Sequence, residues 1–112
     1  MIAKAIVRYL RITPRKAGYV VRPLRKRTVA EALAILSATN RGAAKPVAKL
    51  VASAFANARQ RYPELREEDV IISKAVADEG VRWKRFRAAA FGRAARILKR
   101  TTHITVELEK RA

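Results

Sequence analysis

The 112-residue sequence contains no cysteine, one histidine and few acidic residues. Without cysteine, the chain can form neither a disulfide nor a thiolate metal site, and it has no thiol nucleophile. The only histidine, His103, offers no metal-ligand spacing. We therefore expect no metal and no cofactor.

Long apolar runs are also absent. The N-terminal stretch MIAKAIVRYLRI is interrupted by Lys4, Arg8 and Arg11, so it lacks the continuous apolar region of a signal peptide. No apolar run reaches the roughly 18 residues that a membrane span needs. An anionic membrane surface is the alternative partner for a basic chain, but neither a long amphipathic basic helix nor a lipidation signal is present. We expect a soluble, cytoplasmic chain without membrane insertion.

No catalytic constellation can be assembled from the residues that are present. Asp78 and Glu79 are adjacent, so in a strand they would point to opposite faces. The four glycines do not form the pattern of a phosphate-cradling loop. The sequence therefore does not indicate an enzyme.

Positive charge is the strongest signal in the sequence. There are 26 Lys and Arg against nine Asp and Glu, which gives a formal net charge of +17. The first 30 residues contain no acid, and the segment between Gly80 and His103 carries eight Lys or Arg and no Asp or Glu. A single cation of this kind is usually a solvated surface charge, but acid-free runs repel themselves unless a polyanion neutralises them. Because Lys and Arg release counterions when they meet phosphate, the runs indicate a nucleic-acid binder.

Aromatic residues lie inside the second basic run. Trp83, Phe86 and Phe91 are suited to stacking on unpaired RNA bases. They are equally suited to packing against one another or against the chain's own backbone. The sequence leaves both roles open.

Residues 2–12 predict a strand, because they mix β-branched residues and tyrosine with interspersed charges. The period-two pattern is imperfect, because it places Ile2, Ile6 and Leu10 against Lys4 and Arg8.

Two capping signals predict the starts of helices. Thr13 suits an N-cap and Pro14 the first helical position, whereas Pro23 should disturb or end the short helix that follows. Thr28 and Glu31 predict a capping box in which each side chain accepts from the other residue's backbone N–H.

A third, longer helix is predicted between the turn at 40–42 and Tyr62, and an acidic loop follows it. Apolar residues at helical spacing give each helix a candidate buried stripe. The stripes are Ala17, Val20, Val21 and Leu24; Val29, Ala32, Leu33 and Leu36; and Val47, Leu50, Val51, Ala54, Phe55 and Ala58.

Residues 70–78 and 102–109 predict two further strands. The second alternates cleanly, with Thr102, Ile104, Val106 and Leu108 on one face. The roughly twenty residues between them form either a long loop or a continuation of both strands as an extended ribbon. The order of elements favours an α+β fold with helices on one face of a small antiparallel sheet.

Several segments resemble the universal large-subunit ribosomal protein family number twenty-two. They are AKAIVRYLRITPRKAGYVV near the start, FANA in the third helix, VADEG, and GRAARILKRTTHITVELE near the end. The segments run through nearly the whole chain in the family's order, and the last is the most specific. The stretch AAAF before Gly92 and the proline at position 23 depart from the family's usual pattern.

The resemblance implies one domain, residues 1–112, with three helices packed on a three-stranded antiparallel sheet and a long protruding β-hairpin. The hairpin would span residues 70–108, with its tip near 82–92. In that family the globular part lies near the nascent-chain exit of the large subunit, and the hairpin runs inward through ribosomal RNA to line the peptide exit tunnel. The implied partners are large-subunit ribosomal RNA, neighbouring ribosomal proteins and the nascent peptide.

The resemblance also assigns roles to individual positions. Thr13, Pro14, Arg15 and Lys16 match the motif at the start of the first helix, which is expected to meet RNA phosphates. The residues assigned to the tunnel tip are Trp83, Lys84, Arg85, Ala90 and Phe91. Charge and resemblance together give the predicted RNA-binding set: Arg8, Arg11, Thr13, Arg15, Lys16, Arg25, Lys26, Arg82, Lys84, Arg85, Arg87, Arg93, Arg96, Lys99, Arg100 and His103.

The sequence therefore favours a structural ribosomal protein that binds ribosomal RNA, supports assembly of the large subunit and lines the exit tunnel. From composition alone, the alternative is a free-standing basic nucleic-acid-binding module or an RNA chaperone.

Overall fold

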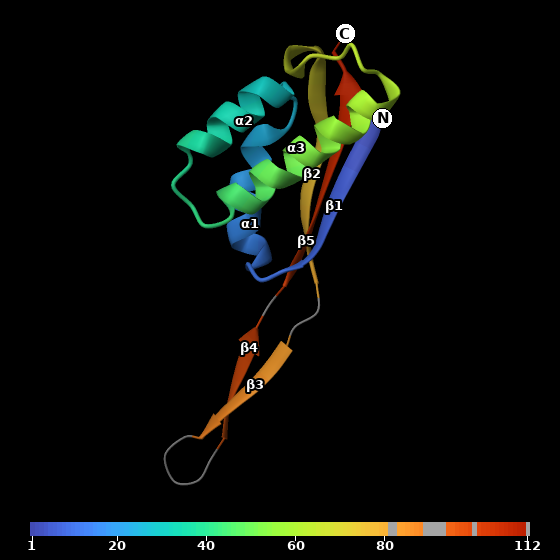
Figure 1. The fold of residues 1–112 in the computed structure, drawn as a ribbon. Coiled ribbons are helices and arrows are strands. Elements are labelled where there is room, and N and C mark those ends of the chain that lie inside the picture. Colours follow the sequence, from blue (N-terminus) through green and yellow to red (C-terminus); the bar gives the residue numbers. More distant parts are fainter. Residues whose placement is uncertain (81–82, 89–93, 100, 112) are drawn as a thin grey trace.

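The computed structural model describes residues 1–80, 83–88, 94–99 and 101–111 of an elongated molecule with extents of 65 × 25 × 17 Å. Strands β1 (Ala3–Leu10), β5 (Thr102–Lys110) and β2 (Val70–Glu79) form an antiparallel sheet in the order β1-β5-β2. Strands β3 (Trp83–Ala88) and β4 (Ala94–Lys99) form a separate antiparallel pair, which projects beyond one end of the sheet (Figure 1).

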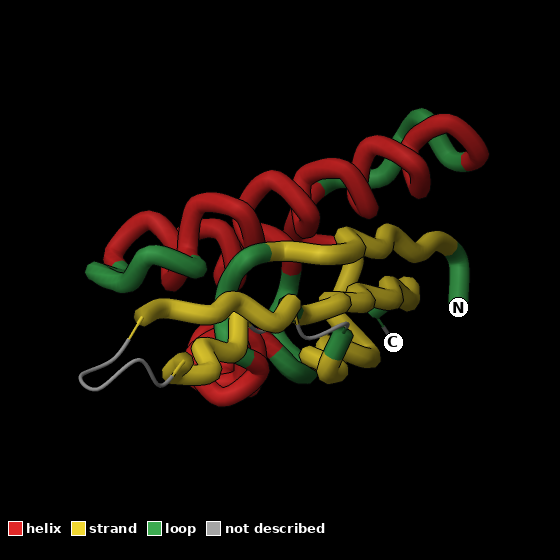
Figure 2. Tube along the Cα trace, turned by 90° about the horizontal axis from the view of Figure 1, so that it is seen from below, coloured by secondary structure: helices red, strands yellow, loops and turns green. Residues whose placement is uncertain are grey.

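Three helices cover one face of the three-stranded sheet. They are α1 (Pro14–Val21), α2 (Val29–Ala38) and α3 (Ala44–Arg61), with short 3-10 turns η1 (Arg22–Leu24) and η2 (Glu67–Asp69). Helix α3 packs over β1 and β5, α1 packs over β2 and β5, and α2 packs against α3. The longest helix runs alongside the strands (Figure 2). This arrangement confirms the predicted α+β fold of three helices on a three-stranded antiparallel sheet.

The core follows from the alternation in β5. Ile104, Val106 and Leu108 are fully buried under the helices, as the alternation predicted. The predicted helical stripes are buried as well, except that Leu33 and Phe55 are only partly covered. Leu33 lines a hollow between α2 and α3, and Phe55 lies under the guanidinium of Arg59, whose Cζ is 6.0 Å from the ring centroid.

Strand β1 places its smaller apolar residues against the helices. Ala3, Ala5 and Val7 pack against the core, whereas Ile6 is 40% exposed on the opposite face. Small residues on the inner face allow α3 to lie close, and Asn57 of that helix donates from Nδ2 to the carbonyl of Lys4 at 3.2 Å. The register with β5 shifts between Val7 and Leu10, so the alternation does not run through the whole strand.

The predicted helix starts are largely confirmed. The Thr13 hydroxyl accepts from the Lys16 backbone N–H at 3.4 Å, α1 ends at Val21, and Pro23 lies in the 3-10 turn that follows. At α2, the Thr28 hydroxyl accepts from the Glu31 N–H at 3.1 Å. The Glu31 carboxylate, however, accepts from the Thr28 hydroxyl rather than from its backbone, so only half of the predicted capping box forms.

The segment between η1 and α2 covers the outer edge of β2. The Lys26 N–H donates to the Ile72 carbonyl at 2.8 Å, and the Ile72 N–H donates to the Arg27 carbonyl at 2.9 Å. Lys26 has a φ of 64°, a left-handed conformation that costs a non-glycine residue energy and here serves to bring the chain onto the strand. Backbone groups that an edge strand would leave unpaired are thereby satisfied.

Of the two alternatives for the segment between β2 and β5, a long loop or an extended ribbon, the described residues form the ribbon. Trp83 pairs with Lys99 and the register continues without a shift to Ala88 and Ala94. The two strands make their main contacts with each other. A ribbon of two strands is marginally stable by itself, which sets this part of the chain apart from the three-stranded sheet.

Candidate nucleic-acid interface

The ribbon leaves the sheet at a root where three chain segments meet. At this root the Gly80 N–H donates to the Thr101 carbonyl at 2.9 Å, which continues the β2–β5 pairing. The Thr102 hydroxyl donates to the Ile12 carbonyl, and Leu10 pairs with Thr102 in register. The end of β1 is therefore tied to the same point as the ends of β2 and β5.

Gly80 and His103 pack tightly at this root. A Cβ on Gly80 would lie 2.5 Å from the Thr101 hydroxyl oxygen and 3.1 Å from His103 Nε2, so no other residue fits without displacement. His103 Nδ1 accepts from the Tyr9 backbone N–H at 3.1 Å, and the two rings meet edge to face with centroids 4.9 Å apart. Tyr9 has a φ of 56°, and the imidazole holds the irregular turn of β1 in place. The structure thus gives His103, a predicted RNA-binding residue, a partner inside the fold.

The N-terminal cations of the predicted set follow one another through the β1–α1 connection. Arg8, Arg11, Arg15 and Lys16 are all exposed there. This connection runs past the end of the sheet from which the ribbon projects (Figure 1). Thr13, in the same connection, uses its hydroxyl as the N-cap of α1. The structure therefore brings this group of cations to the base of the ribbon.

Arg25 and Lys26 lie elsewhere, along the outer edge of β2. Arg25 Nε donates to the Ala75 carbonyl at 3.0 Å, which fixes the side chain against the strand, and both residues are exposed. They form a second group of cations on the globular part.

The register of the ribbon separates its cationic positions. Lys84, Arg85, Arg87, Arg96 and Lys99 are each opposite an uncharged residue: Leu98, Ile97, Ala95, Phe86 and Trp83, respectively. Like charges directly opposite each other destabilise a strand pair, and this register avoids such pairs. Because successive strand positions alternate between faces, cationic positions fall on both faces of the ribbon. A ribbon charged on both faces suits an environment with phosphate on more than one side.

Some predicted residues lie outside the described part of the chain. They are Arg82, Arg93 and Arg100 of the RNA-binding set and Ala90 and Phe91 of the tunnel tip.

Two exposed ion pairs on the described globular part join residues outside the predicted set. Arg27 pairs with Glu31 at 3.3 Å, and the N-terminal amine lies 3.9 Å from a Glu109 carboxylate oxygen. Both pairs are exposed, where such contacts contribute little. Within the described ranges we find neither a group of His, Cys, Asp or Glu that could hold a metal ion nor a helix suited to a membrane span.

Two residues that the sequence did not indicate, Tyr19 and Arg41, are joined by contacts to the predicted RNA-binding residue Arg15. Tyr19 accepts a hydrogen bond from Arg15 Nε at 3.1 Å, and Arg41 lies over its ring with Cζ 5.4 Å from the centroid. The spacing of four between Arg15 and Tyr19 was a usable signal, since such residues are neighbours on a helix. Nothing local signals Arg41, because it reaches Tyr19 from the loop between α2 and α3.

Comparisons with known proteins agree along nearly the whole chain. The model of a family described as Ribosomal protein L22p/L17e matches residues 5–109. A protein of Bifidobacterium longum (strain DJO10A) named Large ribosomal subunit protein uL22 is 51% identical over 110 residues, covering 95% of this chain and 92% of its own length. The protein of the same name from Oceanobacillus iheyensis is 50% identical over 106 residues, covering 95% of this chain and 93% of its own length.

Proposed function

The chain belongs to the ribosomal protein L22p/L17e family, and from this premise we propose how it works in the large ribosomal subunit. As a member of that family it is a structural, RNA-binding protein of the ribosome and not an enzyme. Its partners are ribosomal RNA and other ribosomal proteins.

Ribosomal RNA supplies the polyanion that the charge distribution requires. The strand pairing of the ribbon places no acidic residue opposite its cations, and the mutual repulsion among those cations is relieved when phosphate approaches. The proposal rests on one observation: β3 and β4 pair mainly with each other and have cationic positions on both faces, so RNA can pack on either side of the ribbon.

The hairpin, residues 70–108, extends through that RNA into the peptide exit tunnel, with its tip near 82–92. Trp83, Lys84, Arg85, Ala90 and Phe91 then lie nearest the tunnel and the nascent peptide. By contacting RNA both at the root and along the ribbon, the chain links separate RNA segments and supports assembly of the subunit.

Sedimentation of cell extracts through sucrose gradients tests the proposal. The chain is expected in the large-subunit fraction, and it should stay there in a high-salt wash that strips loosely bound basic proteins. A chain that runs free, or with DNA, at physiological salt contradicts the proposal and supports a free-standing nucleic-acid-binding module.

A further inference from the structure

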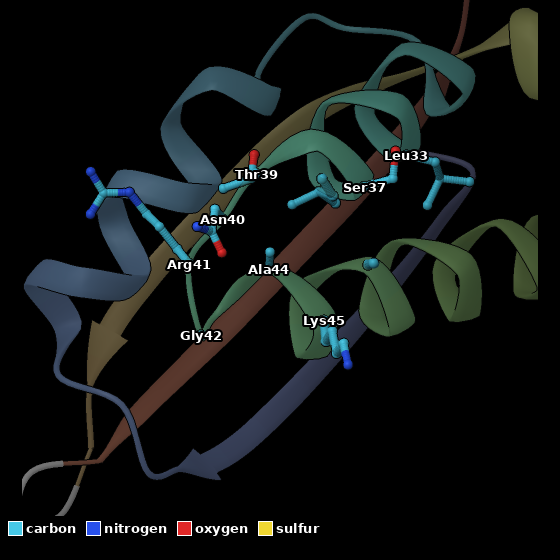
Figure 3. Close-up of a pocket in the computed structure, with 10 residues that line it drawn as sticks. Leu33, Ser37, Thr39, Asn40, Arg41, Gly42, Ala44 and Lys45 are labelled. Atoms are coloured by element: carbon cyan, nitrogen blue, oxygen red, sulfur yellow. The ribbon is translucent and has the colours of Figure 1, made fainter.

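A hollow of about 540 Å³ lies between the end of α2 and the start of α3 (Figure 3). Its volume falls within the roughly 300–1,000 Å³ of typical small-molecule sites. The predicted RNA-binding set includes none of the residues that line it.

The lining combines an apolar floor with a polar rim. Leu36 and Ala44 are buried, and Leu33 and Ala48 are partly covered, so they form the floor. The polar residues at the hollow are Ser37, Thr39, Asn40, Arg41 and Lys45, and none of the lining residues is acidic.

The two cations lie on opposite sides of the hollow. Figure 3 shows the guanidinium of Arg41 extending toward α1 and the side chain of Lys45 extending away on the other side. Both residues are exposed. The hollow is therefore flanked by two positive charges, with a neutral, largely apolar surface between them.

Arg41 is part of a larger cationic surface. Its Cζ lies 5.4 Å from the ring centroid of Tyr19, and Arg15 donates to the hydroxyl of the same tyrosine. Tyr19 thus holds two guanidinium groups close together on one side of the hollow. Pre-positioned guanidinium groups lose less freedom when they bind phosphate, and they bind it in bidentate geometry.

We propose that this hollow holds one unpaired nucleotide of an RNA strand, with its base against the apolar floor and its flanking phosphates on Arg41 and Lys45. The proposal rests on the RNA-binding function stated above and deepens it by assigning a site on the globular part, away from the ribbon. Sequence-specific RNA recognition commonly uses bases splayed out of single-stranded segments.

The arrangement favours a nucleotide within a strand over a free one. A nucleotide in a strand has a phosphate on each side, and the hollow has a cation on each side. Asn40 adds an amide that can both donate and accept at a base edge, and among the described residues its side chain makes no hydrogen bond. A Lys or Arg side chain of a protein partner would meet two like charges here, so an anionic strand fits better.

Gly42 allows the hollow to be filled without disturbing the fold. It lines the hollow, and a Cβ built on it meets no atom within 4 Å. Gly42→Trp should therefore occupy the space while it leaves Arg41 and Lys45 unchanged. Gly42→Ala is the matched control, since it adds only one methyl group.

The charges are tested separately. Arg41→Ala combined with Lys45→Ala removes both flanking cations. Lys4→Ala combined with Lys74→Ala removes two exposed cations from the strands of the sheet and serves as the charge-matched control.

The measurement is an NMR titration of the full-length, isotope-labelled chain, followed at the backbone amides of residues 39–45. The probes are the trinucleotide UpUpU, uridine 5′-monophosphate and inorganic phosphate. We expect UpUpU to shift these amides and to bind at least about tenfold more tightly than the mononucleotide, because it brings a second phosphate. Gly42→Trp and the Arg41/Lys45 double variant should each weaken this binding about tenfold or more, whereas both controls should leave it unchanged.

Three results would overturn the proposal: no shift at 39–45, equal binding of UpUpU and inorganic phosphate, or equal binding of UpUpU and the mononucleotide. The second would show a simple anion patch, and the third a site for free nucleotides. Failure here is separable from failure of the proposed function, because sedimentation with the large subunit does not depend on this hollow. Conversely, a chain that binds UpUpU in the hollow but never enters the subunit would support the nucleotide site and contradict the proposed ribosomal function.

Discussion

Gly80 and Gly42 differ in the space that surrounds the Cα atom, and therefore in whether a larger residue could replace them. At Gly80 the space for a side chain is already filled by Thr101 and His103, whereas at Gly42 it is open. Gly80 is therefore required by packing at the root of the ribbon, where three strands converge.

Replacing Gly80 with alanine should destabilise the chain by about 1–3 kcal/mol, because a Cβ 2.5 Å from the Thr101 hydroxyl oxygen forces the root apart. Urea unfolding followed by circular dichroism measures the change in the free energy of unfolding. Gly42→Ala, the matched control, should change it by less than about 0.5 kcal/mol. Equal effects of the two substitutions would contradict the packing described at the root.

For single residues, the sequence predicted the contacts that join residues close together in the chain. Thr13 and Thr28 were identified as caps because the N–H groups they bind are three residues away. The contacts of Tyr9 with His103 and of Arg25 with Ala75 join residues 94 and 50 positions apart, and no local pattern indicates them. Even a local motif can be only partly realised: the capping-box pattern at Thr28 matches, but only one of its two backbone hydrogen bonds forms.

Among the elements, β5 was the easiest to predict and β1 the hardest. In β5, the central strand, one face lies against the helices along its whole length, so burial matches alternation from Thr102 to Leu108. In β1, an edge strand, the register shift before Leu10 breaks the alternation, and alanines rather than the larger Ile6 occupy the buried face. Composition misleads there because α3 approaches closely and leaves room only for small side chains.

The sheet and the ribbon should differ in stability in the isolated protein. Amides of β3 and β4 should exchange with solvent much faster than those of Ile104 and Val106, because the ribbon has only its own pairing and carries like charges along both strands. Hydrogen–deuterium exchange with NMR or mass spectrometry gives the rates.

In the assembled large subunit, the same amides should become slow to exchange, because RNA neutralises the cations and excludes solvent. The strand β5 serves as the internal reference in both samples. If β3 and β4 exchange as slowly as β5 in the free protein, the ribbon is self-supporting and does not need RNA.

Across the whole molecule, the balance of charge differs between the two ends of the long axis, because acids accompany the cations at one end and the charged residues in the ribbon's pairing are all cations. The acidic turn η2, with Glu67, Glu68 and Asp69, lies at the end of the molecule that also carries both termini (Figure 1). The ribbon with its cationic positions projects from the opposite end. A molecule charged in this way orients in the field of RNA with the ribbon inward and η2 outward. Net charge alone, as read from the sequence, does not give this orientation, because it depends on where the fold places each segment.

Site-specific photocrosslinking in living cells can show whether the ribbon lies within the RNA of the large subunit. A photoreactive amino acid replaces Trp83 in one variant and Glu68 in the other, and the crosslinked RNA is sequenced. We expect position 83 to crosslink to large-subunit ribosomal RNA, and to nascent peptide in translating ribosomes, whereas position 68 should give little RNA. Equal RNA crosslinking at the two positions, or crosslinks from position 83 only to DNA or to unrelated RNA, would show that the ribbon does not lie within that RNA.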